Sequence, residues 1–303
     1  MNKTEKIKSY LADNPFEQTK DVAAKLNVSR RLVRLVKQTN TQPKTAAKIL
    51  SVDIETSPME TYVWGIFKQR IPDTNIIKDW SMLSWSAKWL GEDTIMSQRV
   101  TQEEAMERKD NSIVHKLWEL LNEANLVIAH NAIRFDIRKI NARFLVNGLT
   151  PPSSYQVLDT LKQSQKNFGF ASHKLNYLVS TLIYDEKLHT SFDLWKQCVT
   201  GSSHALRYME KYNQHDVRIL EQIYLLIRPW VKSHMNMGLF NTNDCMVCTN
   251  CGSSNIVAIK NMYVTPANKY KEYRCLHCGA HFREPKSNIT KEQRKTLLTP
   301  NAH

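Results

Sequence analysis

Residues 49–56 read Ile-Leu-Ser-Val-Asp-Ile-Glu-Thr, and the fold assignment is built outward from this stretch. Its apolar first half is typical of a buried β-strand. Asp53 and Glu55 are two positions apart, so on a strand both side chains point to the same face. Two carboxylates this close repel each other, and burial strengthens the repulsion. A divalent cation between them relieves it. We therefore expect half of a metal site here, completed by acids from elsewhere in the chain.

Two further acids stand out by their context. Asp136 ends the motif Asn-Ala-Ile-Arg-Phe-Asp, which follows an apolar strand predicted over 126–129. Asp216 lies in a predicted helix four residues after Tyr212, so these two side chains share one helical face. Hard cations such as Mg²⁺ and Mn²⁺ prefer carboxylate and water oxygens. An all-acid set therefore favours one of these two cations.

In this order, Asp-x-Glu, Asn-x-x-x-Phe-Asp and Tyr-x-x-x-Asp resemble the signature of the ribonuclease-H-like 3′–5′ exonucleases with four acids (DEDDy). Residues 49–231 also resemble the YprB-type domain, which is related to the exonuclease domain of family B DNA polymerases. The wider likeness covers residues 85–91, 158–161, 173–175 and 192–195. A chain with 29 acids produces acid-x-acid pairs by chance, so the weight lies in the order of the three motifs.

The resemblance implies an α/β fold with a ribonuclease-H-like mixed sheet flanked by helices. It implies a 3′–5′ exonuclease that uses two Mg²⁺ or Mn²⁺ ions, which activate water and stabilise the leaving oxygen. The metal ligands carried over to this chain are Asp53, Glu55, Asp136 and Asp216, with Asp53 bridging both ions. Tyr212 is expected to orient the attacking water, because a Tyr hydroxyl with a pKa near ~10 is a poor base. Asn131, inside the second motif, is expected to contact the substrate.

Several neighbouring residues have competing interpretations. Asp159 precedes a helical run, where an N-cap is favoured over a fifth site acid. His130 ends the predicted strand 126–129, and a substrate contact and an ordinary strand end are both open. Trp85 and Trp89 are expected in the core rather than as platforms for bases.

Residues 1–40 are expected to form a small all-α domain that resembles a helix-turn-helix, joined to the body by a linker at 41–48. Asn27 sits at the turn between two helices, and Asn tolerates positive φ better than most residues. Ser29 is a suitable N-cap for the second helix. Arg30, Arg31 and Arg34 would project from that helix toward nucleic acid. A helical pair used for protein contacts is the alternative.

Five of the six cysteines lie between residues 245 and 278. Two Cys-x-x-Cys-Gly knuckles, Cys248/Cys251 and Cys275/Cys278, enclose strand-like residues and resemble a zinc ribbon over 240–285. Four thiolates bind Zn²⁺ tightly and leave no open position for chemistry, so the ion is expected to be structural. Cys245 competes with Cys248 as a ligand, but the glycine after Cys251 favours the 248/251 pair. Lysines, arginines and tyrosines on the ribbon favour nucleic acid over a protein partner, and residues 286–303 are expected to be a mobile basic tail.

The net charge of +13 is concentrated on the flanks. Residues 1–50 hold 11 Lys or Arg against 4 Asp or Glu, and residues 232–303 hold 10 against 4. The body between them holds 21 of each sign. A neutral body between two basic arms suits a polyanionic partner, with solubility as the plainer explanation.

The sequence thus predicts a metal-dependent 3′–5′ exonuclease that acts on nucleic acid, with DNA favoured over RNA. A DNA-binding regulator that uses the nuclease fold as a scaffold, and a structure-selective endonuclease at the same site, are the alternatives. A proofreading role would require a separate polymerase or replication protein. No run approaches 18 apolar residues and residues 1–5 lack the core of a signal peptide, so we expect no membrane partner and a cytoplasmic protein (host cytoplasm if phage-encoded).

Overall fold

The computed structural model describes residues 2–14, 17–40, 47–183, 188, 190–242 and 245–298. The chain divides into two compact units, one formed by Ala47–Tyr224 and the other by Met1–Ala46 together with Leu225–His303. Most of the predicted linker, residues 41–46, lies outside the described residues. No helix in the described ranges has the length and apolarity needed to cross a membrane.

A five-stranded mixed sheet in the order β5-β4-β1-β6-β7 forms the centre of the larger unit. Its strands are β1 (Ile49–Thr56), β4 (Met82–Trp89), β5 (Met96–Arg99), β6 (Leu126–Ala129) and β7 (Gln156–Asp159). β1 pairs antiparallel with β4 and parallel with β6. The predicted α/β class is confirmed, with the quoted stretch 49–56 as the middle strand. A small second sheet pairs β2 (Glu60–Thr61) with β3 (Ile76–Lys78), and the 3₁₀ turn η1 (Asp73–Asn75) precedes β3.

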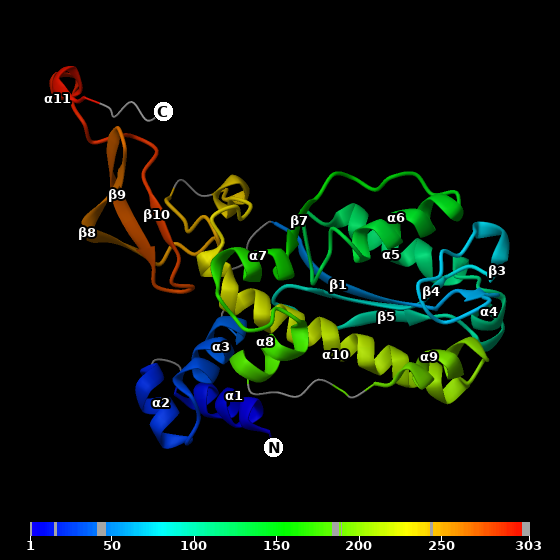
Figure 1. The fold of residues 1–303 in the computed structure, drawn as a ribbon. Helices are drawn as coiled ribbons and strands as arrows, with labels where there is room; N and C mark the ends of the chain where they lie inside the picture. Colours follow the sequence, from blue (N-terminus) through cyan, green and yellow to red (C-terminus); the bar gives the residue numbers. More distant parts are fainter. Residues whose placement is uncertain are drawn as a thin grey trace. The chain divides into compact units, whose positions relative to one another are not determined.

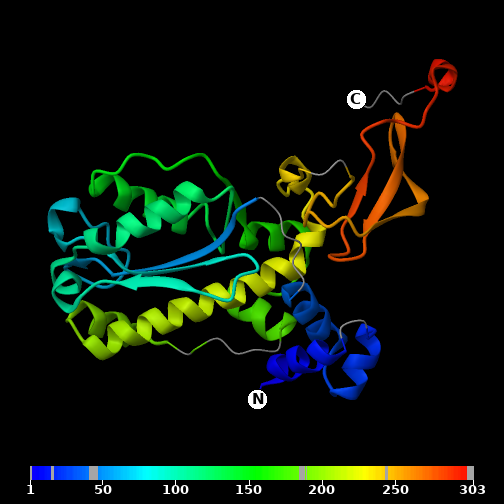
Figure 2. The same ribbon diagram turned by 180° about the vertical axis from the view of Figure 1, so that it is seen from behind.

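Helices cover both faces of this sheet. In Figures 1 and 2, α5 and α6 lie on one face, while α9 and the long α10 run along the other. The helices of this unit are α4 (Gln102–Glu107), α5 (Asn111–Glu123), α6 (Asp136–Val146), α7 (Thr160–Asn167), α8 (Leu175–Leu182), α9 (Phe192–Val199) and α10 (Ser203–Ile227).

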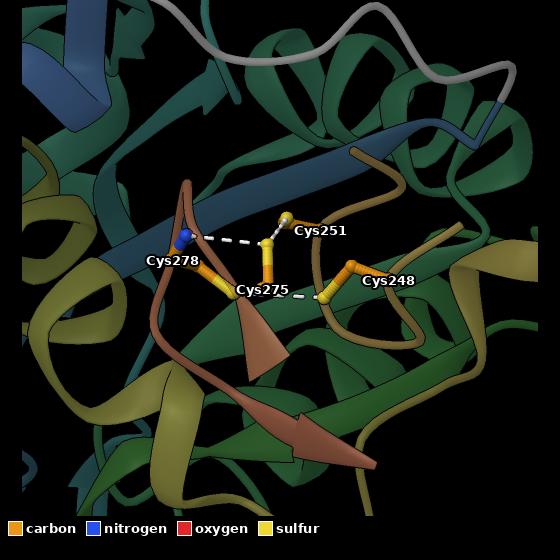
Figure 3. A group of neighbouring side chains, drawn as sticks. All are labelled: Cys248, Cys251, Cys275 and Cys278. Carbon is orange, nitrogen blue, oxygen red and sulfur yellow. Dashed lines mark hydrogen bonds between the residues drawn. The ribbon is translucent and has the colours of Figure 1, made fainter. Parts of the chain in front are cut away.

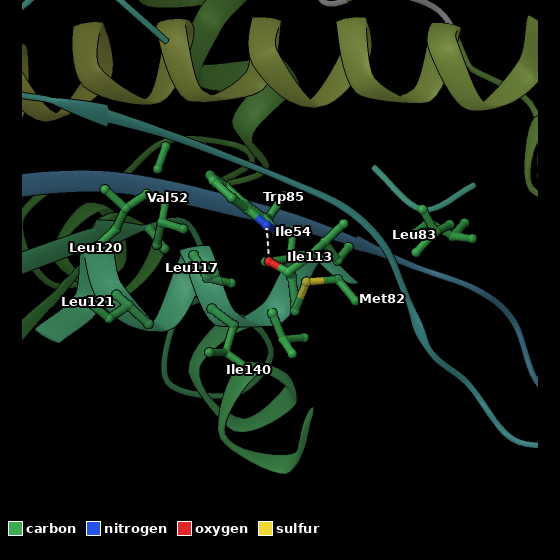
Figure 4. Packing of buried hydrophobic residues seen from close by; sticks show 14 of the residues in the cluster. Val52, Ile54, Met82, Leu83, Trp85, Ile113, Leu117, Leu120, Leu121 and Ile140 are labelled. Atoms are coloured by element: carbon green, nitrogen blue, oxygen red, sulfur yellow. Dashed lines mark hydrogen bonds between the residues drawn. The ribbon is translucent and has the colours of Figure 1, made fainter. Parts of the chain in front are cut away.

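The face of the sheet toward α5 is apolar. Strand alternation brings Val52 and Ile54 of β1 beside Trp85 of β4, and all three are buried. They pack on the leucine-rich side of α5, as Figure 4 shows. The indole Nε1 of Trp85 donates to the carbonyl oxygen of Ile113 at 2.7 Å. Trp85 is therefore part of the core, as expected, rather than a platform for bases.

The opposite face, toward α10, carries polar side chains. Lys88 of β4 donates to both carboxylate oxygens of Glu221 on α10, at 2.8 and 2.6 Å, and both residues are buried. Ser97 and Arg99 of β5 donate to Glu210 of the same helix at 2.7 and 3.0 Å. Ser84 and Ser86, which lie on the same face of β4 as Lys88, are also fully buried. Strands β1, β4 and β5 thus present apolar side chains toward α5 and mostly polar ones toward α10.

The N-terminal residues form α1 (Lys3–Asp13), α2 (Thr19–Lys25) and α3 (Arg30–Asn40), held by a small apolar cluster around Ile7, Val22 and Val33. Asn27 has a φ of 50° at the turn between α2 and α3, as predicted. Ser29 caps α3, because its Oγ accepts the N–H of Leu32 at 3.1 Å.

The C-terminal residues form a three-stranded antiparallel sheet of β8 (Ile256–Thr265), β9 (Asn268–Cys275) and β10 (His281–Arg283). Two 3₁₀ turns, η2 (Arg228–Trp230) and η3 (Met237–Phe240), precede it. Within residues 286–303, expected to be a mobile basic tail, the structure contains the helix α11 (Lys291–Thr296). The Thr290 side chain and Gln293 cap its first turn reciprocally, a local signal that the charge pattern does not show.

Candidate metal centres

Three of the four predicted acids come together. One carboxylate oxygen each from Asp53, Glu55 and Asp216 lies within 4.8 Å of the others. Asp53 and Glu55 project from β1 toward α10, and Asp216 comes from the middle of that helix. Asp216 is buried and the two β1 acids are half-buried. Three converging carboxylates are a hard, anionic oxygen set of the kind that divalent cations prefer.

Tyr212 lies one turn before Asp216 on α10 and is buried. Its ring packs edge-on against Trp195 of α9, with centroids 6.4 Å apart and an interplanar angle of 76°. The same helix α9 brings Cys198 near the acids. Burial, together with the charge of Glu55, raises the pKa of that thiol to about 12. Cys198 therefore stays a protonated, unreactive thiol at neutral pH.

Asn213 is a site residue that the sequence reasoning missed. It is fully buried, and its Nδ2 donates to Oδ2 of Asp53 at 2.5 Å. Its Oδ1 is also buried and has no hydrogen-bond partner among the described residues. Asn213 is three positions before Asp216, so helical periodicity alone predicts that both face the same way. The amide fixes one Asp53 oxygen and leaves a polar oxygen beside the acid cluster.

Asp136, the fourth predicted acid, is the first residue of α6 and lies outside the group of three converging oxygens. It is buried, and burial raises the pKa of its carboxyl to about 7, although hydrogen bonds from its own N–H and from that of Ile54 oppose the shift. The charge of Asp159 adds to the rise. The contact with Ile54 places Asp136 against β1, between the positions of Asp53 and Glu55. A nearby cation would stabilise its ionised form.

Asp159 is a structural cap, as the sequence favoured. Its carboxylate accepts the N–H groups of Leu161 and Lys162 at the start of α7. It also accepts the N–H groups of Asn131 and Ile133, at 3.1 and 3.2 Å. Asn131 has a φ of 70°, so this carboxylate holds the second motif in a left-handed turn.

The remaining predicted contact residues are His130 and three arginines of α3. His130 bonds through Nδ1 to Oγ1 of Thr160 at 2.9 Å, which fits the strand-end interpretation. Arg30 and Arg34 are exposed at the start of α3, and Arg31 beside them is half-buried.

The four predicted cysteines Cys248, Cys251, Cys275 and Cys278 converge at the base of the ribbon, as Figure 3 shows. All four are buried, whereas Cys245 is exposed and stands outside the group. Gly252 and Gly279, with φ of 76° and 86°, follow the second cysteine of each knuckle. Their positive φ closes tight turns. Within these turns the N–H of Asn250 donates to the Cys248 sulfur and the N–H of Cys278 donates to the Cys275 sulfur, each at 3.4 Å.

The sulfur spacing fits a tetrahedral ion. The Sγ atoms of Cys248 and Cys278 are 3.6 Å apart, and those of Cys251 and Cys275 are 3.7 Å apart. Zn–S bonds of about 2.3 Å in a tetrahedron separate the sulfurs by about 3.8 Å. The Cys251 thiol forms hydrogen bonds with the sulfurs of Cys248, Cys275 and Cys278. Together with burial, these bonds raise its pKa. The four groups can ionise together when a cation offsets their charge.

Two comparisons with known proteins found similarities to this chain. A model of the RNase_H superfamily matches residues 87–228. A family B DNA polymerase from the hyperthermophilic archaeon Pyrobaculum calidifontis is similar in structure, with a TM-score of 0.42 and 13% sequence identity. That similarity covers 62% of this chain and 26% of the polymerase chain, so this chain spans about a quarter of the polymerase's length. No curated protein matches.

The RNase H-like fold rests on the superfamily match and on the sheet topology rather than on the polymerase likeness. This match supports a nuclease-type function, for which nucleic acid is the substrate class. The acid cluster and the group of four cysteines supply two sets of donors suited to metal ions.

Proposed function

We propose that the protein is a metal-dependent 3′–5′ exonuclease that hydrolyses nucleic-acid phosphodiesters, with DNA favoured. The observation that carries the proposal is the convergence of Asp53, Glu55 and Asp216 within 4.8 Å on the polar face of an RNase H-like sheet. The 3′–5′ polarity comes from the order and content of the three sequence motifs. Asp136, which contacts β1 at Ile54, is the fourth ligand of the proposal.

The four acids would hold two Mg²⁺ or Mn²⁺ ions, which supply Lewis acidity toward water and the phosphate. The chain's own residues set the geometry. Asn213 fixes one Asp53 oxygen, so that carboxylate is oriented before the metals arrive. The Tyr212 hydroxyl is assigned to orienting the attacking water, and Trp195 restrains its ring. Preorganised groups of this kind reduce the entropy lost on reaching the transition state.

The flanking parts are assigned to substrate binding. Arg30, Arg31 and Arg34 on α3 would contact phosphates. In the central unit, Asn131 would contact the substrate. The ribbon would add further cations that attract phosphates. The guanidinium of Arg283 lies 3.8 Å from the centroid of the Tyr270 ring, and the Lys271 ammonium lies over the Tyr273 ring. A Zn²⁺ ion held by the four cysteines would stabilise the ribbon and take no part in the chemistry.

The test is digestion of DNA and RNA, single- and double-stranded, each labelled at the 5′ end, with Mg²⁺ or Mn²⁺. We expect a ladder that shortens from the 3′ end and stops at a blocked 3′ terminus. Asp53→Ala should abolish turnover, while Glu92→Ala, which removes an exposed acid elsewhere, should not. Cleavage past a blocked 3′ end would instead assign an endonuclease. Turnover by Asp53→Ala equal to the wild type, or no cleavage with either metal, would reject the proposed site.

A further inference from the structure

The segment directly after β1 forms a projecting hairpin. Ser57 and Ser81 close its base, because the Ser57 N–H donates to the Ser81 carbonyl oxygen at 2.8 Å and the Ser81 N–H donates to Ser57 Oγ at 2.9 Å. Above them β2 pairs with β3, and Thr61 Oγ1 donates to the Asn75 carbonyl oxygen at 2.8 Å. The base is only two residues from Glu55. In both ribbon views this cyan segment lies at the end of the sheet where β1 ends (Figures 1 and 2).

The tip of this hairpin, residues 62–71, exposes large apolar side chains. Trp64 is 100% exposed, Phe67 85% and Tyr62 75%. Ile66 beside them is 90% exposed. None of the four belongs to a described hydrophobic cluster, so they contribute little to folding. A contiguous exposed group of this kind usually marks a binding surface.

The chemistry of the tip identifies its occupant. Residues 61–72 contain Lys68 and Arg70 and no acid, within a body whose net charge is zero. Both cations are exposed and directly follow the aromatic residues, since Lys68 is next to Phe67 and Arg70 is two positions further on. Aromatic rings provide faces on which bases stack, and neighbouring cations attract the phosphates between those bases. Stacking requires unpaired bases, so the mixture fits a single strand better than a duplex.

We propose that the hairpin tip is a stacking platform for single-stranded nucleic acid, with Trp64, Phe67 and Tyr62 holding bases and Lys68 and Arg70 holding phosphates. The platform lies at the end of β1, so it would hold the strand whose 3′ end reaches the acid cluster. That last step rests on the proposed nuclease function, whereas binding at the tip does not. The platform therefore assigns the proposed enzyme a preference for single-stranded ends.

The test uses the full chain with Asp53→Ala, so that bound strands survive. Fluorescence anisotropy would measure the affinity for a labelled oligothymidine and for a blunt duplex of equal length, over a range of salt concentrations. The tip variant is Trp64→Ala with Phe67→Ala. The matched control is Leu145→Ala with Val146→Ala, which removes two exposed apolar side chains from the end of α6.

We expect the tip variant to bind the single strand about tenfold or more weakly, with the duplex affinity and the salt slope unchanged. Lys68→Gln with Arg70→Gln should reduce the salt slope for the single strand by up to about two. The control should behave as the parent. Unchanged single-strand affinity of the tip variant overturns the proposal and leaves protein contact as the role of the hairpin. Equal losses on strand and duplex also overturn it. Weaker strand binding by the tip variant, together with no turnover of the wild-type protein with either metal, would uphold the platform and reject the nuclease.

Discussion

The carboxamide of Asn213 donates to the carboxylate of Asp53 at 2.5 Å, linking the middle of α10 to the central strand of the sheet. Asn213 and Asp53 are 160 residues apart in sequence. The bond occupies one oxygen of an acid that would serve as a metal ligand in the proposed site. Asn213 is thus a positioning residue for the site, because it acts through Asp53.

Asn213→Ala should weaken metal affinity and lower turnover by about 10- to 100-fold, as loss of a group that orients a ligand usually does. The measurement is single-turnover cleavage over a range of metal concentrations. It gives the apparent metal affinity and the cleavage rate constant at saturating metal. Gln214→Ala is the matched control, because this neighbouring amide donates to Ser97 rather than to a site acid. Equal metal dependence in Asn213→Ala and the wild type would contradict the positioning role.

Tyr212→Phe should lower kcat by about 10- to 100-fold, less than Asp53→Ala, because one oriented hydroxyl is lost while the metal ligands remain. The phenyl ring keeps the edge-on packing with Trp195, so the melting temperature should stay close to that of the wild type. Pre-steady-state cleavage with saturating substrate measures the chemical step directly. If Tyr212→Phe cleaves at the wild-type rate, the water-orienting role is wrong.

Lys88→Met should lower the free energy of unfolding by about 3–5 kcal/mol, because Glu221 would be left buried without its cation. Lys88→Met combined with Glu221→Leu should recover much of the loss. Urea denaturation of both single variants and the double variant gives the coupling energy. Lys116→Met removes an exposed pair with Glu119 and should leave the free energy of unfolding close to that of the wild type. Additive losses from Lys88→Met and Glu221→Leu would show that the buried pair contributes no coupling.

Purified protein should contain one tightly bound Zn²⁺ per chain, and a chelator should remove it. Without the ion, β8, β9 and β10 should lose protection from hydrogen exchange, because a small ribbon of this kind depends on its metal to fold. Cys275→Ser should lose zinc, whereas Cys245→Ser should retain it, because Cys245 is exposed and stands outside the group of four buried cysteines. Elemental analysis and hydrogen exchange provide the two measurements. Full zinc content in Cys275→Ser would place the ion elsewhere.

The sequence predicts the central elements well where apolar runs are short and bounded. The strand expected over 49–56 is β1, and the strand expected over 126–129 is β6. The sequence does not predict β5, Met96–Arg99. In this strand Ser97 and Arg99 face Glu210 instead of a hydrophobic core. A strand on a polar face carries no apolar alternation to detect. Asn213 was missed for a related reason, since its role depends on a strand 160 residues away.

The residues on the two faces of the central sheet are constrained in different ways. Trp85 and its neighbours are constrained by volume, since a smaller residue would leave a cavity beneath α5. The acids on the α10 face contribute little to that packing, so a lineage could exchange or lose them by drift and still inherit a folded body. The architecture thus allows chemistry to be gained or lost at small cost to foldability.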